Sequence, residues 1–146
     1  MYQFSKISNE RLSTTHKDLQ IIMNKALEVI DISILEGARS DETQIKYFKE
    51  GKSKLDGITQ KSKHQITKQQ PLSHAVDIAP YPIDFSNKQK SLARFYYTAG
   101  IIKAIAHDLH KKGIISHSIR WGGDWNSNNI FTDQTFDDLV HFELKA

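Results

Sequence analysis

Two short apolar segments of the sequence contain polar residues of the types that bind metal ions. In segment 75–79, the two-residue period of a strand places Asp77 on the face opposite the branched apolar side chains. In segment 139–144, the same period places His141 and Glu143 together on the face opposite three apolar residues. Each segment therefore presents potential metal ligands on a face that is not simply apolar.

A third ligand can come from His64, which lies in the loop ahead of the first of these segments. Spacing alone leaves other interpretations open. A lone strand histidine is often a hydrogen-bonded structural residue, and a strand aspartate can pair with a cation or face solvent. The residue pattern by itself is thus compatible with a site made of His64, Asp77 and His141, but it does not require one.

Composition limits the chemistry of any such site. The chain has 146 residues, seven histidines and no cysteine, which excludes a disulfide framework, a thiolate zinc site and a cysteine nucleophile. A metal site must then consist of imidazole and carboxylate groups. The net charge of +3 indicates a mild preference for anionic partners. The lysines of segment 51–72 are not interleaved with aromatic residues, so no nucleic-acid partner is expected.

The length predicts a single domain that spans residues 1–146. The N-terminal segment lacks the apolar region of a signal peptide. The stretch 95–102 is far shorter than the roughly 20 residues that a membrane helix needs. We therefore expect a monomer that is made in the cytoplasm without a signal peptide and is not stably inserted in a membrane.

Hydrophobic periodicity predicts three helices and four strands. Thr15 and Asp18 resemble a capping box for the first helix, and Ser40 can cap the second. Gly113 is a suitable residue for the end of the third helix. The helices are expected over residues 15–30, 40–51 and 87–112, and the strands over residues 32–37, 75–79, 118–122 and 139–144.

Apolar side chains suggest how these elements pack. Tyr47 and Phe48 are expected to anchor the second helix, and a stripe from Leu92 to Leu109 forms the buried face of the third. Segment 51–72 has no periodicity, and a loop this long is usually functional or mobile. Because helices and strands are interspersed without regular alternation, we predict an α+β fold with a central, largely antiparallel sheet flanked by helices.

Three motifs, in this order, closely resemble those of a known family. They are Ser62-Lys63-His64-Gln65 followed by the strand that contains Asp77, the block 119–125 with the letters IRWGGDW, and the closing segment 136–144 with the letters FDDLVHFEL. The family is that of the zinc-dependent peptidoglycan peptidases, which includes D-alanyl-D-alanine carboxypeptidases and phage L-alanyl-D-glutamate endopeptidases. The resemblance runs from about Glu36 to Leu144 and is strongest to the phage endolysin branch.

The resemblance implies a hedgehog/D,D-peptidase-like fold and assigns roles to five residues. It implies that His64, Asp77 and His141 bind zinc, which leaves one position of a tetrahedral ion for water, as in catalytic sites. Asp138 matches the family's catalytic carboxylate, which would take a proton from that water and pass it to the departing amine. Arg39 matches the arginine that faces the substrate.

The sequence departs from many family members in the loop between His64 and Asp77, which is enlarged. His74 lies closer to Asp77, but a separation of three residues on a strand puts their side chains on opposite faces. His64 is therefore the preferred ligand. Ser62 and Asp124 are candidates for orienting the imidazoles. Trp121 and Trp125 either form walls of the cleft or belong to the core.

The resemblance implies an endopeptidase that cuts between L-alanine and D-glutamate in the peptidoglycan stem peptide and acts on the cell wall after release. It would do so without a separate wall-binding domain. A D,D- or L,D-carboxypeptidase that trims a terminal alanine would use the same zinc core and is the alternative enzyme. A catalytically inactive, zinc-stabilised wall-binding module is an alternative of another class. The presence of Asp138 argues against that module, because a structural zinc site needs no further carboxylate.

Overall fold

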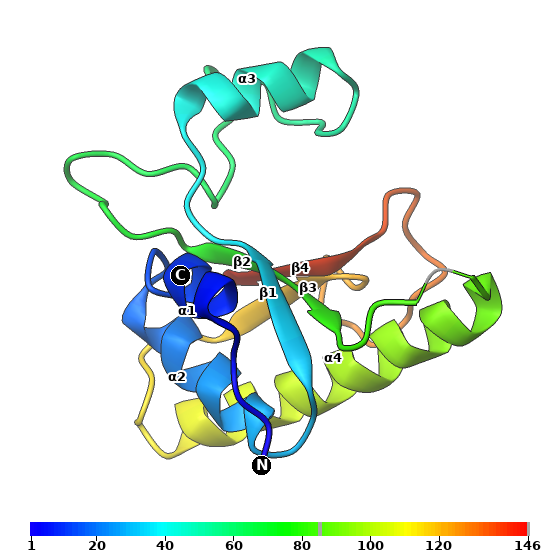
Figure 1. Ribbon diagram of the computed structural model, residues 1–146. Helices are drawn as coiled ribbons and strands as arrows, with labels where there is room; N and C mark the ends of the chain where they lie inside the picture. Colours follow the sequence, from blue (N-terminus) through cyan, green and yellow to red (C-terminus); the bar gives the residue numbers. More distant parts are fainter. Residues whose placement is uncertain (85, 146) are drawn as a thin grey trace.

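A four-stranded antiparallel sheet forms the centre of the protein (Figure 1). The computed structural model describes residues 1–84 and 86–145. The spatial order of the strands is β1-β2-β4-β3, so the last strand in the sequence lies inside the sheet. The strands are β1 (Ile32–Glu36), β2 (Ala75–Pro80), β3 (Ile119–Gly122) and β4 (Asp138–Leu144).

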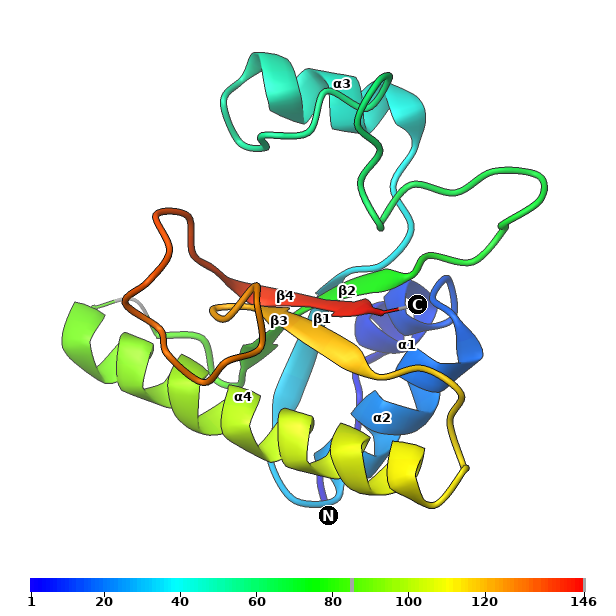
Figure 2. The same cartoon turned by 180° about the vertical axis from the view of Figure 1, so that it is seen from behind.

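The helices lie on both sides of this sheet and confirm the α+β prediction. Three of them lie on one side, whereas α3 stands on the other, as the two opposite views show (Figures 1 and 2). Among the described residues, no helix is both long and apolar enough to cross a membrane. The helices are α1 (Lys6–Leu12), α2 (Lys17–Leu27), α3 (Asp41–Lys49) and α4 (Lys88–Lys111).

The hydrophobic core fills the space between the sheet, α2 and α4. The two-residue period of the strands sends Ile78 and Phe142 into this core, and both are almost fully buried. Leu19 and Ile22 approach from α2 and Ile102 from α4. The alternation predicted for β2 and β4 is confirmed, so the polar residues of both strands lie on the opposite face of the sheet.

The opposite face is covered by residues 40–72, which contain α3 and the long connection to β2 and which we call the α3 lobe. Ser40 caps α3 as predicted, because its hydroxyl accepts a hydrogen bond from the Thr43 amide. The lobe has no apolar centre comparable to the main core. The only fully buried side chain of α3 is Gln44, which donates hydrogen bonds to the Ser53 hydroxyl and to the Leu55 carbonyl.

The prediction that Tyr47 and Phe48 anchor α3 is therefore wrong. Tyr47 is only half-buried, and Phe48 is exposed. The lobe packs by polar contacts through Gln44, which a search for apolar periodicity does not detect. Leu92 is likewise exposed although it fits the stripe of α4, because it lies in the first turns of a helix whose buried part begins at Thr98.

The N-terminal region also differs from the prediction. Helix α1 was not expected, since its only buried residues are Ser8 and Leu12 and the segment has no apolar stripe. The N-cap of α2 is His16, whose Nδ1 accepts a hydrogen bond from the Asp18 amide. Thr15 does not form the predicted capping box, because its buried hydroxyl donates to the Leu12 carbonyl instead.

Candidate active site

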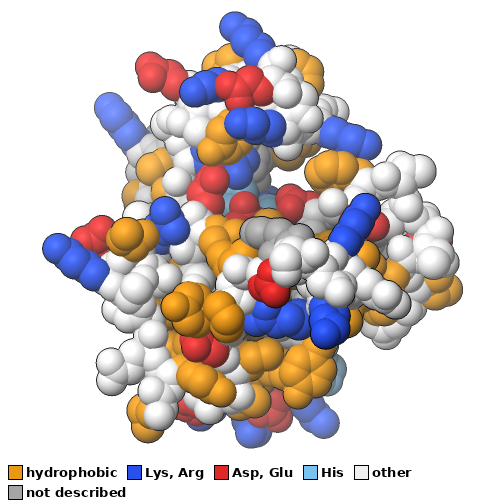
Figure 3. Space-filling model, turned by 45° about the vertical axis from the view of Figure 1, so that its right-hand side comes forward, with side chains coloured by type: hydrophobic (Ala, Val, Ile, Leu, Met, Phe, Trp, Pro, Cys, Tyr) orange, Lys and Arg blue, Asp and Glu red, His pale blue; other side chains and the backbone are white. Residues whose placement is uncertain are grey.

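A cleft of about 530 Å³ lies between the α3 lobe and the polar face of the sheet. Figure 3 shows this hollow, with acidic and histidine side chains at its floor and lysine and arginine side chains around it. His64, Asp77, Asp138 and His141 all line the cleft, and so does Arg39. The structure thus brings together all five residues to which the family resemblance assigns roles.

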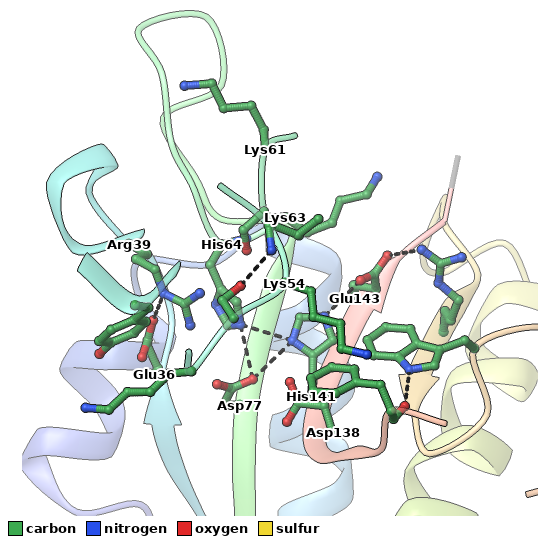
Figure 4. Close-up of a pocket in the computed structure, with 18 residues that line it drawn as sticks. Glu36, Arg39, Lys54, Lys61, Lys63, His64, Asp77, Asp138, His141 and Glu143 are labelled. Atoms are coloured by element: carbon green, nitrogen blue, oxygen red, sulfur yellow. Dashed lines mark hydrogen bonds and ion pairs between the residues drawn. The ribbon is translucent and has the colours of Figure 1, made fainter. Parts of the chain in front are cut away.

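Two histidines and an aspartate converge at the floor of the cleft (Figure 4). The Nε2 atom of His64 lies 3.1 Å from Oδ1 of Asp77 and 3.1 Å from Nδ1 of His141. The third distance, from Nδ1 of His141 to Oδ1 of Asp77, is 3.2 Å. Atoms held at about 2.0–2.1 Å around a tetrahedral metal ion lie roughly 3.3 Å from one another. The donor set and its spacing therefore fit a divalent metal ion.

The sheet register places two of these residues side by side. Asp77 in β2 pairs directly with His141 in β4, so their side chains leave the same face of adjacent strands. His64 comes from the α3 lobe, and its main chain is tied down by two hydrogen bonds. Its carbonyl accepts from the Arg39 amide at 2.8 Å, and its amide donates to the Ser62 hydroxyl at 3.1 Å.

Each imidazole is oriented by a hydrogen bond from the nitrogen that points away from the triad. Nδ1 of His64 lies 2.7 Å from the carbonyl oxygen of Gly37, at the end of β1. A side chain at Gly37 would collide with Thr14 and with the carbonyl of Arg11, so only glycine lets this carbonyl approach. The contact fixes the tautomer in which Nε2 of His64 is free to bind a metal.

The orienting partner of His141 is Glu143. Its Oε1 lies 2.8 Å from Nε2 of His141, and its Oε2 accepts a hydrogen bond from Arg120 at 2.7 Å. Metal-binding histidines commonly donate a hydrogen bond from their other ring nitrogen to a carboxylate, which orients the ring. The two-residue period of the strand predicts that Glu143 shares a face with His141, but it does not predict that Glu143 orients the imidazole. The sequence signal for it is the His-x-Glu spacing within one strand.

Electrostatics keep the carboxylate of the triad ionised. Burial raises the pKa of Asp77, but the hydrogen bonds with His141 and His64 outweigh it and hold that pKa well below its ordinary range. Burial lowers the pKa of His141, whereas Asp77 and Glu143 raise it to about 9. A buried carboxylate that stays ionised beside two imidazoles is a donor set suited to a metal cation.

Asp138 opens β4 and lines the same cleft. Burial and the nearby charge of Asp77 raise the pKa of its carboxyl above the ordinary value, although His141, His64 and Arg39 partly oppose this. A carboxyl with a raised pKa in a cleft is suited to accept and release protons.

Arg39 lies on the far side of the cleft, where three neighbours hold its guanidinium. Its Nε donates to Glu36, one Nη donates to Oε1 of Gln44 at 2.6 Å, and the group stacks 4.8 Å from the ring centre of Tyr47. The other Nη makes no hydrogen bond within the described residues. The side chain is therefore rigid and retains a donor for a ligand in the cleft.

The remaining candidates divide between the cleft and other regions. Trp125 lines the cleft and lies 5.6 Å from the His141 ring. Trp121 is a core residue, 2% exposed, and packs against Tyr96 and Phe142. His74 does not join the triad, and its ring contacts those of two other histidines, His16 and His117.

Neither predicted partner of the imidazole rings has that role. Ser62 binds the backbone amide of His64 and makes no hydrogen bond with the imidazole. Asp124 is fully buried in another turn, where it accepts from the amides of Asn128 and Asn129 and pairs with Lys103 at 3.4 Å. It stabilises that turn, and the prediction that it orients a ligand is wrong.

An antiparallel sheet with a candidate metal triad, a carboxylate and an arginine in one cleft has the parts of a metal-dependent hydrolase. Comparisons with known proteins agree with a hydrolase and do not name a metal. Residues 1–145 match the model of the family described as phage L-alanyl-D-glutamate peptidase. The L-alanyl-D-glutamate peptidase of Escherichia phage T5 is 30% identical over 135 residues, which covers 91% of this chain and 88% of that protein.

The fold is similar to that of a solved structure, the L-Ala D-Glu endopeptidase ChiX of Serratia marcescens. The TM-score is 0.69 over 99% of this chain and 90% of that chain, and the 22% identity makes this a likeness of fold alone. The chain belongs to the phage L-alanyl-D-glutamate peptidase family. It is a peptidase, and the family resemblance of its three sequence motifs is confirmed.

Proposed function

We propose that this peptidase is a zinc-dependent endopeptidase that cuts the bond between L-alanine and D-glutamate in the peptidoglycan stem peptide. The observation that carries the proposal is the convergence of His64, Asp77 and His141 at 3.1–3.2 Å in a cleft that also contains Asp138 and Arg39. The family assignment supports the choice of bond. The enzyme would act as a monomer on the wall after its release from the cytoplasm.

In this proposal Nε2 of His64, Oδ1 of Asp77 and Nδ1 of His141 hold the zinc ion. Gly37 and Glu143 keep the two imidazoles in the required tautomers. The chemistry that zinc supplies when bound is activation of a water molecule and polarisation of the scissile carbonyl. All remaining steps depend on side chains of the chain itself.

Asp138 is proposed to move the proton. Its carboxylate accepts a proton from the attacking water and then delivers it to the nitrogen of the departing glutamyl residue. The raised pKa of Asp138 supports both halves of this task, because a carboxyl that holds a proton more readily is a better base and still a competent acid.

Arg39 is proposed to stabilise the negative charge that develops on the scissile carbonyl oxygen. Its guanidinium is held in place by Glu36, Gln44 and Tyr47 before substrate arrives. A donor that is already oriented needs no rearrangement when the charge forms, and such donors contribute much of the rate in hydrolases.

The test is a digest of purified peptidoglycan, analysed for new N-terminal D-glutamate and for free alanine. We expect new glutamyl amino termini and no release of terminal D-alanine. Free alanine without new glutamyl termini would identify a carboxypeptidase and contradict the proposed bond. Zinc content is measured on the same preparations.

Two variants separate metal binding from proton transfer. We expect His141→Ala to lose both zinc and activity, and Asp138→Asn to keep zinc while turnover falls about 10²–10⁴-fold. Asp137→Asn is the matched control, because Asp137 is the adjacent, exposed carboxylate and its side chain binds Gln134. Full activity in Asp138→Asn would exclude Asp138 as the base.

A further inference from the structure

Six cationic side chains line the cleft, and they differ in whether a carboxylate already neutralises them. Four of them form ion pairs with acidic residues: Arg39 with Glu36, Lys52 with Glu50, Lys61 with Asp41, and Arg120 with Glu143. Within the described residues, Lys54 and Lys63 have no such partner. These two ammonium groups are therefore the charges in the cleft that remain available to an anionic ligand.

Of these two, Lys54 is held over the active site. Its ammonium group lies 4.8 Å from the ring centre of Phe136, a favourable cation–π distance. Phe136 stacks on Trp125 with an interplanar angle of 8°, and Trp125 lies against the His141 ring. Figure 4 shows Lys54 extending across the cleft on the His141 side, whereas Lys61 and Lys63 extend away from the triad.

The proposed substrate brings a negative charge to this region. In the bond between L-alanine and D-glutamate, the departing amine belongs to a residue with two carboxyl groups. One of them forms the next peptide bond of the stem, and the other remains a free carboxylate. That carboxylate lies only a few bonds from the scissile carbonyl, so it must enter the cleft beside the triad when the substrate is bound.

We propose that Lys54, supported by Phe136, forms the subsite for this free carboxylate and makes the enzyme selective for substrates that carry it. The inference rests on the proposed function. Lys54 already has an apolar and aromatic support, so less freedom is lost when the ammonium pairs with an anion. Glu143 does not compete for Lys54, since it is paired with Arg120 and His141.

The experiment compares two soluble peptides that differ only at that group. Both contain the L-alanyl-D-glutamyl bond, and in one the free carboxylate is replaced by a carboxamide of the same shape. We measure kcat/KM of the parent, Lys54→Met, Lys54→Arg and Phe136→Leu on both peptides. Lys68→Met is the matched control, because Lys68 is an exposed lysine of the same lobe that does not line the cleft.

The parent should prefer the carboxylate peptide by about tenfold to a hundredfold, the size expected for a hydrogen bond to a charged group. In Lys54→Met, kcat/KM should fall on the carboxylate peptide and stay unchanged on the carboxamide peptide, so the preference is lost. Lys54→Arg should keep most of the preference. Phe136→Leu should reduce it although the lysine is present. Lys68→Met should behave like the parent.

A second measurement does not depend on turnover. The released peptide with its free glutamyl amine is titrated calorimetrically into the parent and into Lys54→Met, and its affinity should fall by a similar factor in the variant.

The outcomes distinguish failure of the subsite from failure of the proposed function. If the parent cleaves both peptides equally well, or if Lys54→Met loses the same factor on both, the subsite is contradicted while the endopeptidase stands. If the parent cuts neither peptide at the L-alanyl-D-glutamyl bond, both the proposed function and the proposed subsite are contradicted.

Discussion

At the scale of single residues, the most informative contact is the one behind His141. Glu143 does not point at the site where a metal would lie, yet it decides which nitrogen of His141 carries the proton. Its second oxygen is held by Arg120, so the carboxylate cannot rotate away without losing an ion pair. Metal affinity should therefore depend on a residue that never contacts the metal.

We predict that Glu143→Gln lowers zinc affinity by about 10–100-fold and leaves the fold intact. The amide has the shape of the carboxylate but no negative charge to support the His141 imidazole or to hold Arg120. A competition titration with a chromophoric chelator measures the affinity. The control is Glu28→Gln, because Glu28 is the exposed C-cap residue of α2. This variant should bind zinc like the parent. Equal affinity in both variants would show that Glu143 has no such role.

At the scale of elements, the α3 lobe is held together and joined to the sheet by polar side-chain contacts. It supplies His64 to the triad, and Arg39, the residue just before the lobe, donates to Glu36 at the end of β1. Gln44 joins these parts, because its carbonyl oxygen accepts from Arg39 and its amide group binds two points of the following loop. Gly57 fits against Gln44 at a positive φ, where an added Cβ would lie 2.8 Å from Cγ of Gln44.

We predict that Gln44→Ala loosens the lobe without unfolding the core. The partly buried Leu55 carbonyl loses its side-chain donor and the Ser53 hydroxyl loses one of its two hydrogen bonds, which should make local opening easier by about 1–3 kcal/mol. Hydrogen exchange should accelerate over residues 41–65, while the amides of β2 and β4 keep their protection. Asn24→Ala, which removes an exposed side-chain hydrogen bond on α2, is the control. Uniform acceleration across the whole chain would contradict a local role.

The same elements show how far sequence reasoning reaches. The two-residue period of β2 and β4 is a property of strands in general, so the sequence alone predicts that Asp77 and His141 lie opposite the apolar side chains of their strands, as the structure shows. The pairing of His64 with these two came from the family motif, because its position depends on the path of the whole lobe. Gln44 could not be recognised, since its partners in the loop and at Arg39 come together only after folding. Strand alternation places Glu143 beside His141, but its contact with His141 Nε2 and with Arg120 is known only from the structure.

At the scale of the whole molecule, one side of the sheet provides stability and the other carries the site. On the core side, Asp18 at the start of α2 accepts hydrogen bonds from the amides of Ser116 and His117 and lies 2.7 Å from Nδ1 of His117. This contact joins α2 to the connection between α4 and β3. Burial raises the pKa of Asp18, but these hydrogen bonds outweigh it, so that its pKa is lowered.

We predict that Asp18→Asn destabilises the protein near neutral pH by about 1–3 kcal/mol. A lowered pKa in the folded state means that the unfolded chain binds protons more readily, so the contribution of Asp18 is present above the ordinary value of 3.8 and is lost as the pH falls below it. Chemical unfolding at pH 6 and pH 3 should show the difference shrinking on acidification. The control is Asp108→Asn, which removes an exposed ion pair with Lys112 in α4. Its free energy of unfolding should change little at either pH.

The long connection between His64 and β2 has a practical consequence. Residues 66–69 are exposed and do not line the cleft. They form a tight turn, in which the Thr67 amide donates a hydrogen bond to the Gln70 carbonyl. Chain added at such a tip costs little loop-closure entropy and disturbs no buried group. The loop is therefore a suitable graft point, where a binding domain can be inserted without disturbing the residues that line the cleft.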